Sequence, residues 1–435
     1  MPRIILENFR ILDETTDGPG SVVLEDGLIR DLIPGPAPRS SGGALVIDGR
    51  RWASNESLIL MPALVDLHAH FRDPGGLSKE NLESAALAAA AGGYGTLVCM
   101  ANTSPVIDTA EKAAALKARA DRLGLIDLYP ALSLTMDMEG QKLSGITALP
   151  QPAYTPRLLS EDGKDVARYG TFLAALTEAR RLGLPVSCHC DAGGPEAEAA
   201  KMAGQGRSVW SRLEENNGVR RAIGLGMRAG GHVHIAHVST AEAVELIRQA
   251  KAALQEGRDQ AVPFTLTCEA APHHIALTEE TALALGEETF GRVNPPLRTG
   301  EDRQALIAGL LDGTIDAIAT DHAPHTIENK SSGSPGFSGL ETAFGVCFTE
   351  LVQGEGGGLA LRRLSALMSA APARILGLGG DGPLGRGRIA AGLRADLAVA
   401  RVGSPWTVEP DQFKSRGRNS PFGGRNLFGQ ILLTI

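Results

Sequence analysis

The sequence predicts an α/β protein in which a (β/α)8 barrel carries a small β domain formed by the two chain ends. Three observations lead to this prediction. Strand-like and helix-like segments alternate from residue 64 to residue 320, which is the pattern of a parallel barrel. Short apolar runs separated by turn-forming residues lie near both termini. The histidines fall in clusters at or just past the predicted strand ends.

The two chain ends are expected to form one discontinuous β-rich domain. It comprises residues 1–60 and 385–435, and residues 61–384 form the barrel. Its strands are expected at residues 3–9, 21–25, 28–33, 44–48, 395–400 and 430–435.

The barrel segment contains eight predicted strands. They are expected at residues 64–70, 95–100, 126–134, 157–160, 185–190, 232–238, 264–268 and 315–320. Helices are expected between them at residues 78–91, 109–123, 165–182, 240–253 and 301–311. Because the carboxyl ends of barrel strands meet at one mouth, catalytic residues are expected there.

Composition excludes several classes of protein. A formal net charge of −8 argues against a surface for nucleic acid or anionic membranes. Acidic and polar residues come too early in residues 1–7 for a signal peptide, and no apolar run is long enough to cross a bilayer. Five cysteines, an odd number, indicate a reducing compartment, so a cytoplasmic protein is expected.

The most informative stretch is Leu64-Val65-Asp66-Leu67-His68-Ala69-His70. Its apolar residues predict a buried strand, and alternation places His68 and His70 on one face, where they can chelate one metal ion. An isolated H-x-H motif is more often a pair of hydrogen-bonded core histidines. The position of the other histidines decides between these interpretations.

Those histidines end other predicted strands. His189 ends the fifth strand and His237 the sixth, and the pairs His273/His274 and His322/His325 follow the seventh and the eighth. Side chains distant in sequence therefore converge on one mouth of the barrel, which predicts a metal site. His232 and His234 are interpreted as packed wall residues, and Cys188 and Cys190 as packing residues turned away from His189.

Four motifs occur together along the barrel: H-x-H-x-R at residues 68–72, M-x-N-T at 100–103, E-D-G at 161–163 and T-D-H-A-P-H at 320–325. In this combination the chain resembles the class I dihydroorotases of the amidohydrolase superfamily, from about residue 61 to residue 422. The resemblance implies a barrel of the metal-dependent hydrolase type.

The resemblance also implies the site residues. The metal ligands would be His68, His70, Asp162, His189, His237 and Asp321. They would hold one or two zinc ions with a bridging hydroxide, although manganese or cobalt would also suit imidazole and carboxylate donors. Asp321 would act as the catalytic acid and base. The substrate would be bound by Arg72, Asn102, Asn294 and His325. Ala101 stands where the family commonly has proline.

Asp162 marks a difference from related cyclic amidohydrolases, in which a carboxylated lysine bridges two metal ions. Here the family pattern puts Asp162 at the ligand position, and Lys164 lies beyond Gly163 on the expected loop. Because aspartate is the shorter side chain, the second metal ion is expected to bind more weakly.

By resemblance the expected reaction is the reversible cyclisation of N-carbamoyl-L-aspartate to L-dihydroorotate in pyrimidine biosynthesis. Two alternatives stay open: another cyclic amidohydrolase, such as a dihydropyrimidinase or an allantoinase, and a non-catalytic dihydroorotase-like subunit that supports aspartate transcarbamoylase. The expected partners are a small-molecule substrate, further copies of the same chain in a homo-oligomer, and aspartate transcarbamoylase.

Overall fold

The computed structural model describes residues 3–35, 43–52, 58–150, 152–257, 262–354 and 358–435. Eight parallel strands of the described residues form two neighbouring sheets. A three-stranded sheet contains β6 (Leu64–Ala69), β7 (Tyr94–Cys99) and β8 (Asp127–Pro130). A five-stranded sheet contains β9 (Leu159–Ser160), β10 (Pro185–Cys188), β11 (Gly231–Ile235), β12 (Phe264–Ala270) and β13 (Ala317–Ile318).

Isolated parallel bridges join these two sheets at both edges. Leu132 pairs with Leu159 between β8 and β9, and Ala69 at the end of β6 pairs with His322 beyond β13. The backbone N–H of His70 also donates to the carbonyl of His322 over 2.8 Å. The eight strands thus follow one another around a ring in chain order, in agreement with the predicted fold class.

Helices follow most of the barrel strands. They are α1 (Leu82–Ala91), α2 (Ala110–Leu123), α3 (Tyr169–Leu182), α4 (Pro195–Met202), α5 (Arg207–Ala229), α6 (Ala241–Gln255), α7 (Pro272–Ala276), α8 (Glu279–Leu285), α9 (Gly300–Asp312), α10 (Ile327–Ser331), α11 (Ala343–Cys347), α12 (Leu361–Ser365) and α13 (Ala371–Ile375). Among the residues that the structure describes, no helix is both long and apolar enough to span a bilayer.

Capping explains why α1 starts later than residue 78, where the sequence predicted it. The Asn81 side chain accepts a hydrogen bond from the backbone N–H of Ser84 over 2.8 Å, and Asp73 accepts one from the N–H of Leu82 over 3.1 Å. Together they bind N–H groups that a helix leaves without partners in its first turn. The polar residues before Asn81 therefore stay outside the helix.

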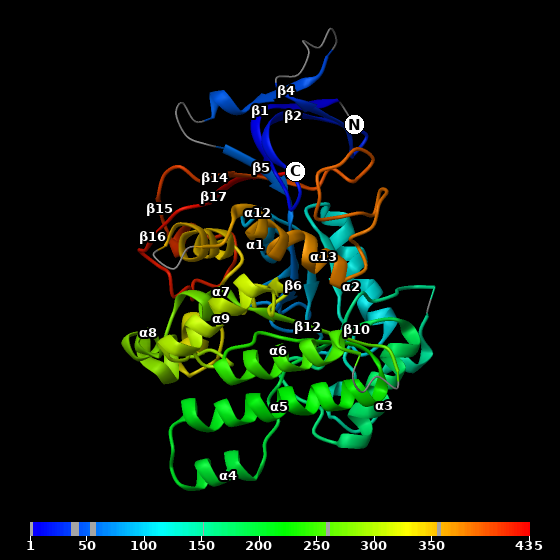
Figure 1. The fold of residues 1–435 in the computed structure, drawn as a ribbon, viewed down its shortest axis with the longest axis vertical. Helices are drawn as coiled ribbons and strands as arrows, with labels where there is room; N and C mark the ends of the chain where they lie inside the picture. Colours follow the sequence, from blue (N-terminus) through cyan, green and yellow to red (C-terminus); the bar gives the residue numbers. More distant parts are fainter. Residues whose placement is uncertain (1–2, 36–42, 53–57, 151, 258–261, 355–357) are drawn as a thin grey trace.

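Strands from both chain ends share one sheet, at the top of Figure 1. Its order is β17 (Gln430–Thr434), β14 (Leu397–Arg401), β5 (Leu58–Pro62), β1 (Ile4–Leu12), β2 (Asp17–Glu25) and β3 (Leu28–Pro34), and β4 (Leu45–Asp48) also pairs with β1. A short separate ribbon pairs β15 (Trp406–Thr407) with β16 (Asn426–Leu427). The domain limits at residues 60/61 and 384/385 stay a prediction.

Alternation along β6 decides which side chains can reach the barrel mouth. Val65 and Leu67 pack in a buried cluster with Ala373 of α13. Asp66 and His68 therefore point to the opposite face of the strand. Both are fully buried, so the strand directs polar side chains inward and apolar ones toward the helices.

Candidate metal centre and active site

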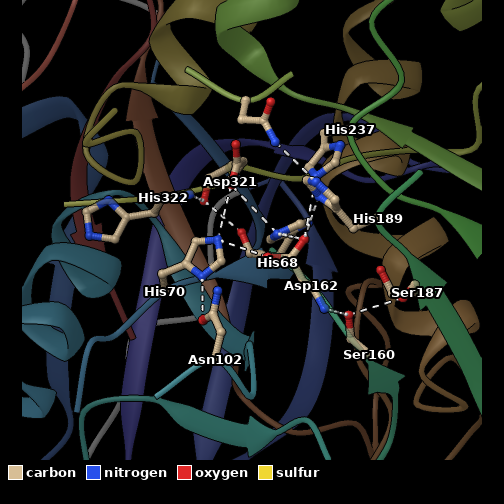
Figure 2. Close-up of polar contacts among 12 residues, drawn as sticks. His68, His70, Asn102, Ser160, Asp162, Ser187, His189, His237, Asp321 and His322 are labelled. Carbon is tan, nitrogen blue, oxygen red and sulfur yellow. Dashed lines mark hydrogen bonds and ion pairs between the residues drawn. The ribbon is translucent and has the colours of Figure 1, made fainter. Parts of the chain in front are cut away.

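The six predicted metal ligands meet at the carboxyl ends of five strands (Figure 2). His68 is the penultimate residue of β6, and His70 follows that strand directly. The other four come just after β9, β10, β11 and β13, namely Asp162, His189, His237 and Asp321. All six are at most 6% exposed.

Asp162 lies among all four histidines. Its Oδ1 is 3.2 Å from His68 Nε2, 3.3 Å from His189 Nδ1 and 3.5 Å from His237 Nε2. Its Oδ2 is 3.4 Å from His70 Nε2. One carboxylate thus presents its two oxygens to different histidines, which is the arrangement that a ligand shared by two ions requires.

Asp321 is the second carboxylate of the cluster. Its Oδ1 lies 3.3 Å from His70 Nε2 and 3.6 Å from His68 Nε2. Two sets of three residues could each hold a metal ion, because one donor atom from each residue lies within 4.8 Å of the other two. The first set is His68, Asp162 and His237, and the second is His68, His70 and Asp321. His189 belongs to neither set and contacts the cluster through Asp162 and through His237 Nε2, 2.9 Å away.

The donor set fits a divalent metal ion. In the described part of the chain, the buried atoms His68 Nε2 and Asp162 Oδ1 have no hydrogen-bond partner, although buried polar atoms normally have one. Imidazole nitrogen and carboxylate oxygen are common zinc ligands. The six residues named above would hold the ion or ions.

The pKa shifts show that the cluster favours positive charge at its centre. Burial works against ionisation of Asp162, but the charge of His68 and the nearby imidazoles of His189 and His237 hold its pKa well below the usual range. Burial likewise opposes ionisation of Asp321, and His70 and His68 lower its pKa. Burial lowers the pKa of His68, yet the carboxylates of Asp162, Glu269 and Asp321 raise it well above the ordinary value. A divalent cation would satisfy the same carboxylates.

Hydrogen bonds from neighbouring residues orient the ligands. His70 Nδ1 lies 3.0 Å from Asn102 Oδ1, and His68 Nδ1 lies 3.0 Å from Glu269 Oε1. The backbone N–H of Asp162 donates to Ser160 Oγ over 3.0 Å (Figure 2). The sequence analysis assigned no role to Glu269, although a carboxylate at the end of a buried strand beside a pair of histidines was a usable signal.

Three of the predicted site residues have strained backbones. Arg72, His237 and Asp321 have φ angles of 56°, 30° and 48°, in the left-handed region that residues other than glycine rarely adopt. Each such residue costs of order 1–3 kcal/mol, and such residues cluster at functional sites. Their clustering at one mouth supports a functional rather than a purely structural role for it.

A cavity of about 330 Å³ opens over the cluster. All four predicted substrate-binding residues line it, together with five of the six predicted ligands. Sequence reasoning did not identify the further lining residues Lys79, Gly163, Ala323, Ser334, Pro335 and Gly336. All of these lie outside helices and strands. Gly163 and Ala323 belong to the E-D-G and T-D-H-A-P-H motifs, whereas neither periodicity nor a motif marked the other four.

Two basic groups lie at one side of the cavity. Arg72 Nη2 is 3.3 Å from His325 Nε2, and Arg72 Nε donates to the carbonyl of Pro324 over 3.4 Å. Burial lowers the pKa of Arg72 to about 10 against the attraction of Asp321 and Asp162. The guanidinium thus stays charged at neutral pH, and burial makes an anionic partner favourable.

Asn294 lines the same cavity next to His189. Its Nδ2 is 3.2 Å from His189 Nε2, and its Oδ1 accepts a hydrogen bond from Arg207 Nη2 over 2.9 Å. Arg207 begins α5, and the sequence contained no signal for its position. Asn294 therefore connects a predicted ligand to a cation outside the cluster.

Comparison with known proteins agrees with this geometry. Residues 59–420 match the amidohydrolase family. A dihydroorotase of Clostridium botulinum is 36% identical over 432 residues, covering 99% of this chain and 97% of that protein. The dihydroorotase of Thermus aquaticus is 39% identical over 448 residues, again covering 99% and 97%. The chain belongs to the dihydroorotases of the amidohydrolase family.

Solved structures show how far the fold is shared. An L-hydantoinase (dihydropyrimidinase) from Arthrobacter aurescens superimposes with a TM-score of 0.83 at 24% identity, covering all of this chain and 95% of that one. At this identity the likeness concerns the fold alone. It agrees with the predicted barrel of the metal-dependent hydrolase type.

In this dihydroorotase-family chain, Lys164 does not contact the cluster. Its Nζ donates to the carbonyl of Met138 over 3.1 Å. Gly163, with a φ of +86°, makes the turn between the two residues, and a side chain there would meet Asn102 Nδ2 at 3.0 Å. The geometry therefore leaves Asp162 as the carboxylate that faces the four histidines. Cys188 and Cys190 are buried and belong to the hydrophobic core.

Proposed function

We propose that this protein is a dihydroorotase that interconverts N-carbamoyl-L-aspartate and L-dihydroorotate. The single observation that supports this most is the presence, in one cavity, of a histidine–carboxylate cluster and a half-buried arginine. The cluster suits hydrolysis of a cyclic amide, and the arginine suits the carboxylate that dihydroorotate carries.

Substrate binding is assigned to Arg72, Asn102, Asn294 and His325. The planar guanidinium of Arg72 can donate two parallel hydrogen bonds to a carboxylate. Asn102, next to His70, and Asn294, next to His189, would orient the ring by donating or accepting hydrogen bonds. Charge and geometry together would set the amide over Asp321.

Proton transfer is assigned to Asp321. Its carboxylate, ionised in the free protein, would take a proton from the attacking water and deliver it to the ring nitrogen as the amide bond breaks. In the direction of cyclisation the same carboxylate would remove the proton from the carbamoyl nitrogen and assist the loss of water. Asp321 lines the cavity, where a bound substrate can reach it.

Zinc is proposed as the metal, held by His68, His70, Asp162, His189, His237 and Asp321. When bound, it would lower the pKa of water to about 7 and polarise the amide carbonyl. The nitrogen and oxygen donors would also accept manganese or cobalt. Homo-oligomer formation, association with aspartate transcarbamoylase and a cytoplasmic location stay predictions.

Ring opening of L-dihydroorotate by the purified, zinc-loaded protein tests this function, with dihydrouracil as the matched substrate that lacks the carboxylate. We expect turnover of dihydroorotate and little of dihydrouracil. Efficient hydrolysis of dihydrouracil would favour a dihydropyrimidinase. Absence of both activities with zinc fully bound would favour a non-catalytic subunit.

A further inference from the structure

Hydrogen-bonding side chains extend from His68 into β11 and β12. His68 Nδ1 lies 3.0 Å from Glu269 Oε1, and Glu269 Oε2 lies 3.0 Å from His234 Nε2. Thr267 Oγ1 lies 2.8 Å from His234 Nδ1 and 2.7 Å from His232 Nε2. We call these five residues the histidine–glutamate chain. His232 and His234 thus form hydrogen bonds in addition to packing in the barrel wall.

Strand register places this chain on one face of the sheet. His234 of β11 pairs directly with Thr267 of β12 in the parallel ladder. Alternation puts His232 on the same face as His234, and Glu269 on the same face as Thr267. His68 and His234 have no exposed surface and Glu269 is 1% exposed. Bulk water therefore cannot replace the hydrogen bonds between them.

Counting protons assigns a direction to every hydrogen bond. An ionised carboxylate only accepts, so both His68 Nδ1 and His234 Nε2 must carry the proton that they share with Glu269. With one proton on each imidazole, His234 has a lone pair at Nδ1, which accepts from the hydroxyl of Thr267. That hydroxyl has one proton, so it accepts from His232 Nε2. Each donor points along the chain toward Glu269.

We propose that the histidine–glutamate chain positions His68 for metal binding by confining its proton to Nδ1. Nε2 is then the atom left to bind the metal ion, and it is this atom that faces Asp162 Oδ1 at 3.2 Å and Asp321 Oδ1 at 3.6 Å. Glu269, His234 and Thr267 are positioning residues. The inference rests on the metal centre proposed above.

A buried carboxylate that accepts from two histidines depends on the protonation of both. If the Thr267 hydroxyl that donates to His234 Nδ1 were removed, the proton of His234 could move from Nε2 to Nδ1. Glu269 would then lose its hydrogen bond from His234. A partner of this kind typically changes metal affinity by 10–100-fold. Thr267 lies two hydrogen bonds further from the metal site than Glu269, so we expect an effect near the lower limit.

The test compares Thr267→Val with Thr267→Ser in the full-length protein. Valine has nearly the same shape but no hydroxyl, and serine keeps the hydroxyl. Zinc dissociation constants are measured by competition with a chromophoric chelator. Imidazole ¹⁵N spectra of histidine-labelled protein report which ring nitrogen of His234 carries the proton. Glu269→Gln serves as a second variant, since an amide cannot accept from both histidines.

We expect Thr267→Val to weaken zinc binding about tenfold. In this variant the proton of His234 should be found on either ring nitrogen. Thr267→Ser should bind zinc within about twofold of the unmodified protein, and Glu269→Gln should weaken binding at least as much as Thr267→Val. Unchanged affinity in Thr267→Val, or an equal loss in Thr267→Ser, would overturn the inference. If the unmodified protein bound no zinc, the metal centre itself would be refuted, and the inference with it.

Discussion

Replacing Arg72 with methionine tests how the proposed substrate is held. In the structure this guanidinium is half-buried, and the hydrogen bonds described for it, to the Pro324 carbonyl and the His325 ring, are long at 3.4 and 3.3 Å. Its donors are therefore available to a carboxylate. Methionine keeps much of the side-chain length and removes the charge.

The magnitude follows from the loss of a charged hydrogen-bonding pair inside a cavity. Removing one partner of such a pair costs about 2–5 kcal/mol. A loss of about 3 kcal/mol corresponds to roughly 100-fold in kcat/KM, and most of it should appear in KM. Arg72→Lys keeps the charge but not the planar fork, so we expect an intermediate loss.

The assay measures kcat and KM for dihydroorotate ring opening, with zinc content as the control. Arg72 is not among the proposed ligands, so both variants should retain their zinc. Equal KM values for Arg72→Met and the unmodified protein would refute the assignment of Arg72 to the substrate carboxylate. Loss of zinc in Arg72→Met would show that the change acts through the metal cluster instead.

Three further predictions concern other parts of the site. Asp162→Ala should lose zinc and most activity, while Lys164→Ala should resemble the unmodified protein. The unmodified protein, once stripped of metal, should regain activity when zinc is added in carbon-dioxide-free buffer. Bicarbonate-dependent recovery that Lys164→Ala abolishes would instead identify the lysine as the bridging ligand. Asp321→Asn should keep part of its zinc but lose turnover, because an amide cannot carry the proton; comparable rates across neutral pH would exclude the proton-transfer role. Lys330→Met should lower the free energy of unfolding by about 3 kcal/mol, because the ammonium of Lys330 donates to three backbone carbonyls. It should also raise KM, because two of these carbonyls belong to the cavity-lining residues Ser334 and Gly336. Unchanged stability would contradict that account.

Local sequence determined much of the barrel. Strand-forming runs and the helices between them follow from apolar periodicity, and the position of His68 and His70 at a strand end follows from the alternation of Leu64, Val65 and Leu67. Element ends were less accurate. Residues 126–134 were expected as one strand, but β8 covers only Asp127–Pro130, because periodicity does not specify where a ladder partner ends.

By itself, the sequence determined the kind of fold, the strand-end histidines and carboxylates, and, through its motifs, the family. Only the tertiary structure decided what each of those side chains faces. Contacts between residues far apart in the chain show this. Asp162 lies among four histidines while Lys164 donates to Met138. Arg207 donates to Asn294, and Glu269 accepts from His68 and His234. The physical reason is that periodicity reports which face of an element is buried, whereas the partner of a buried polar atom is set by the packing of several elements at once.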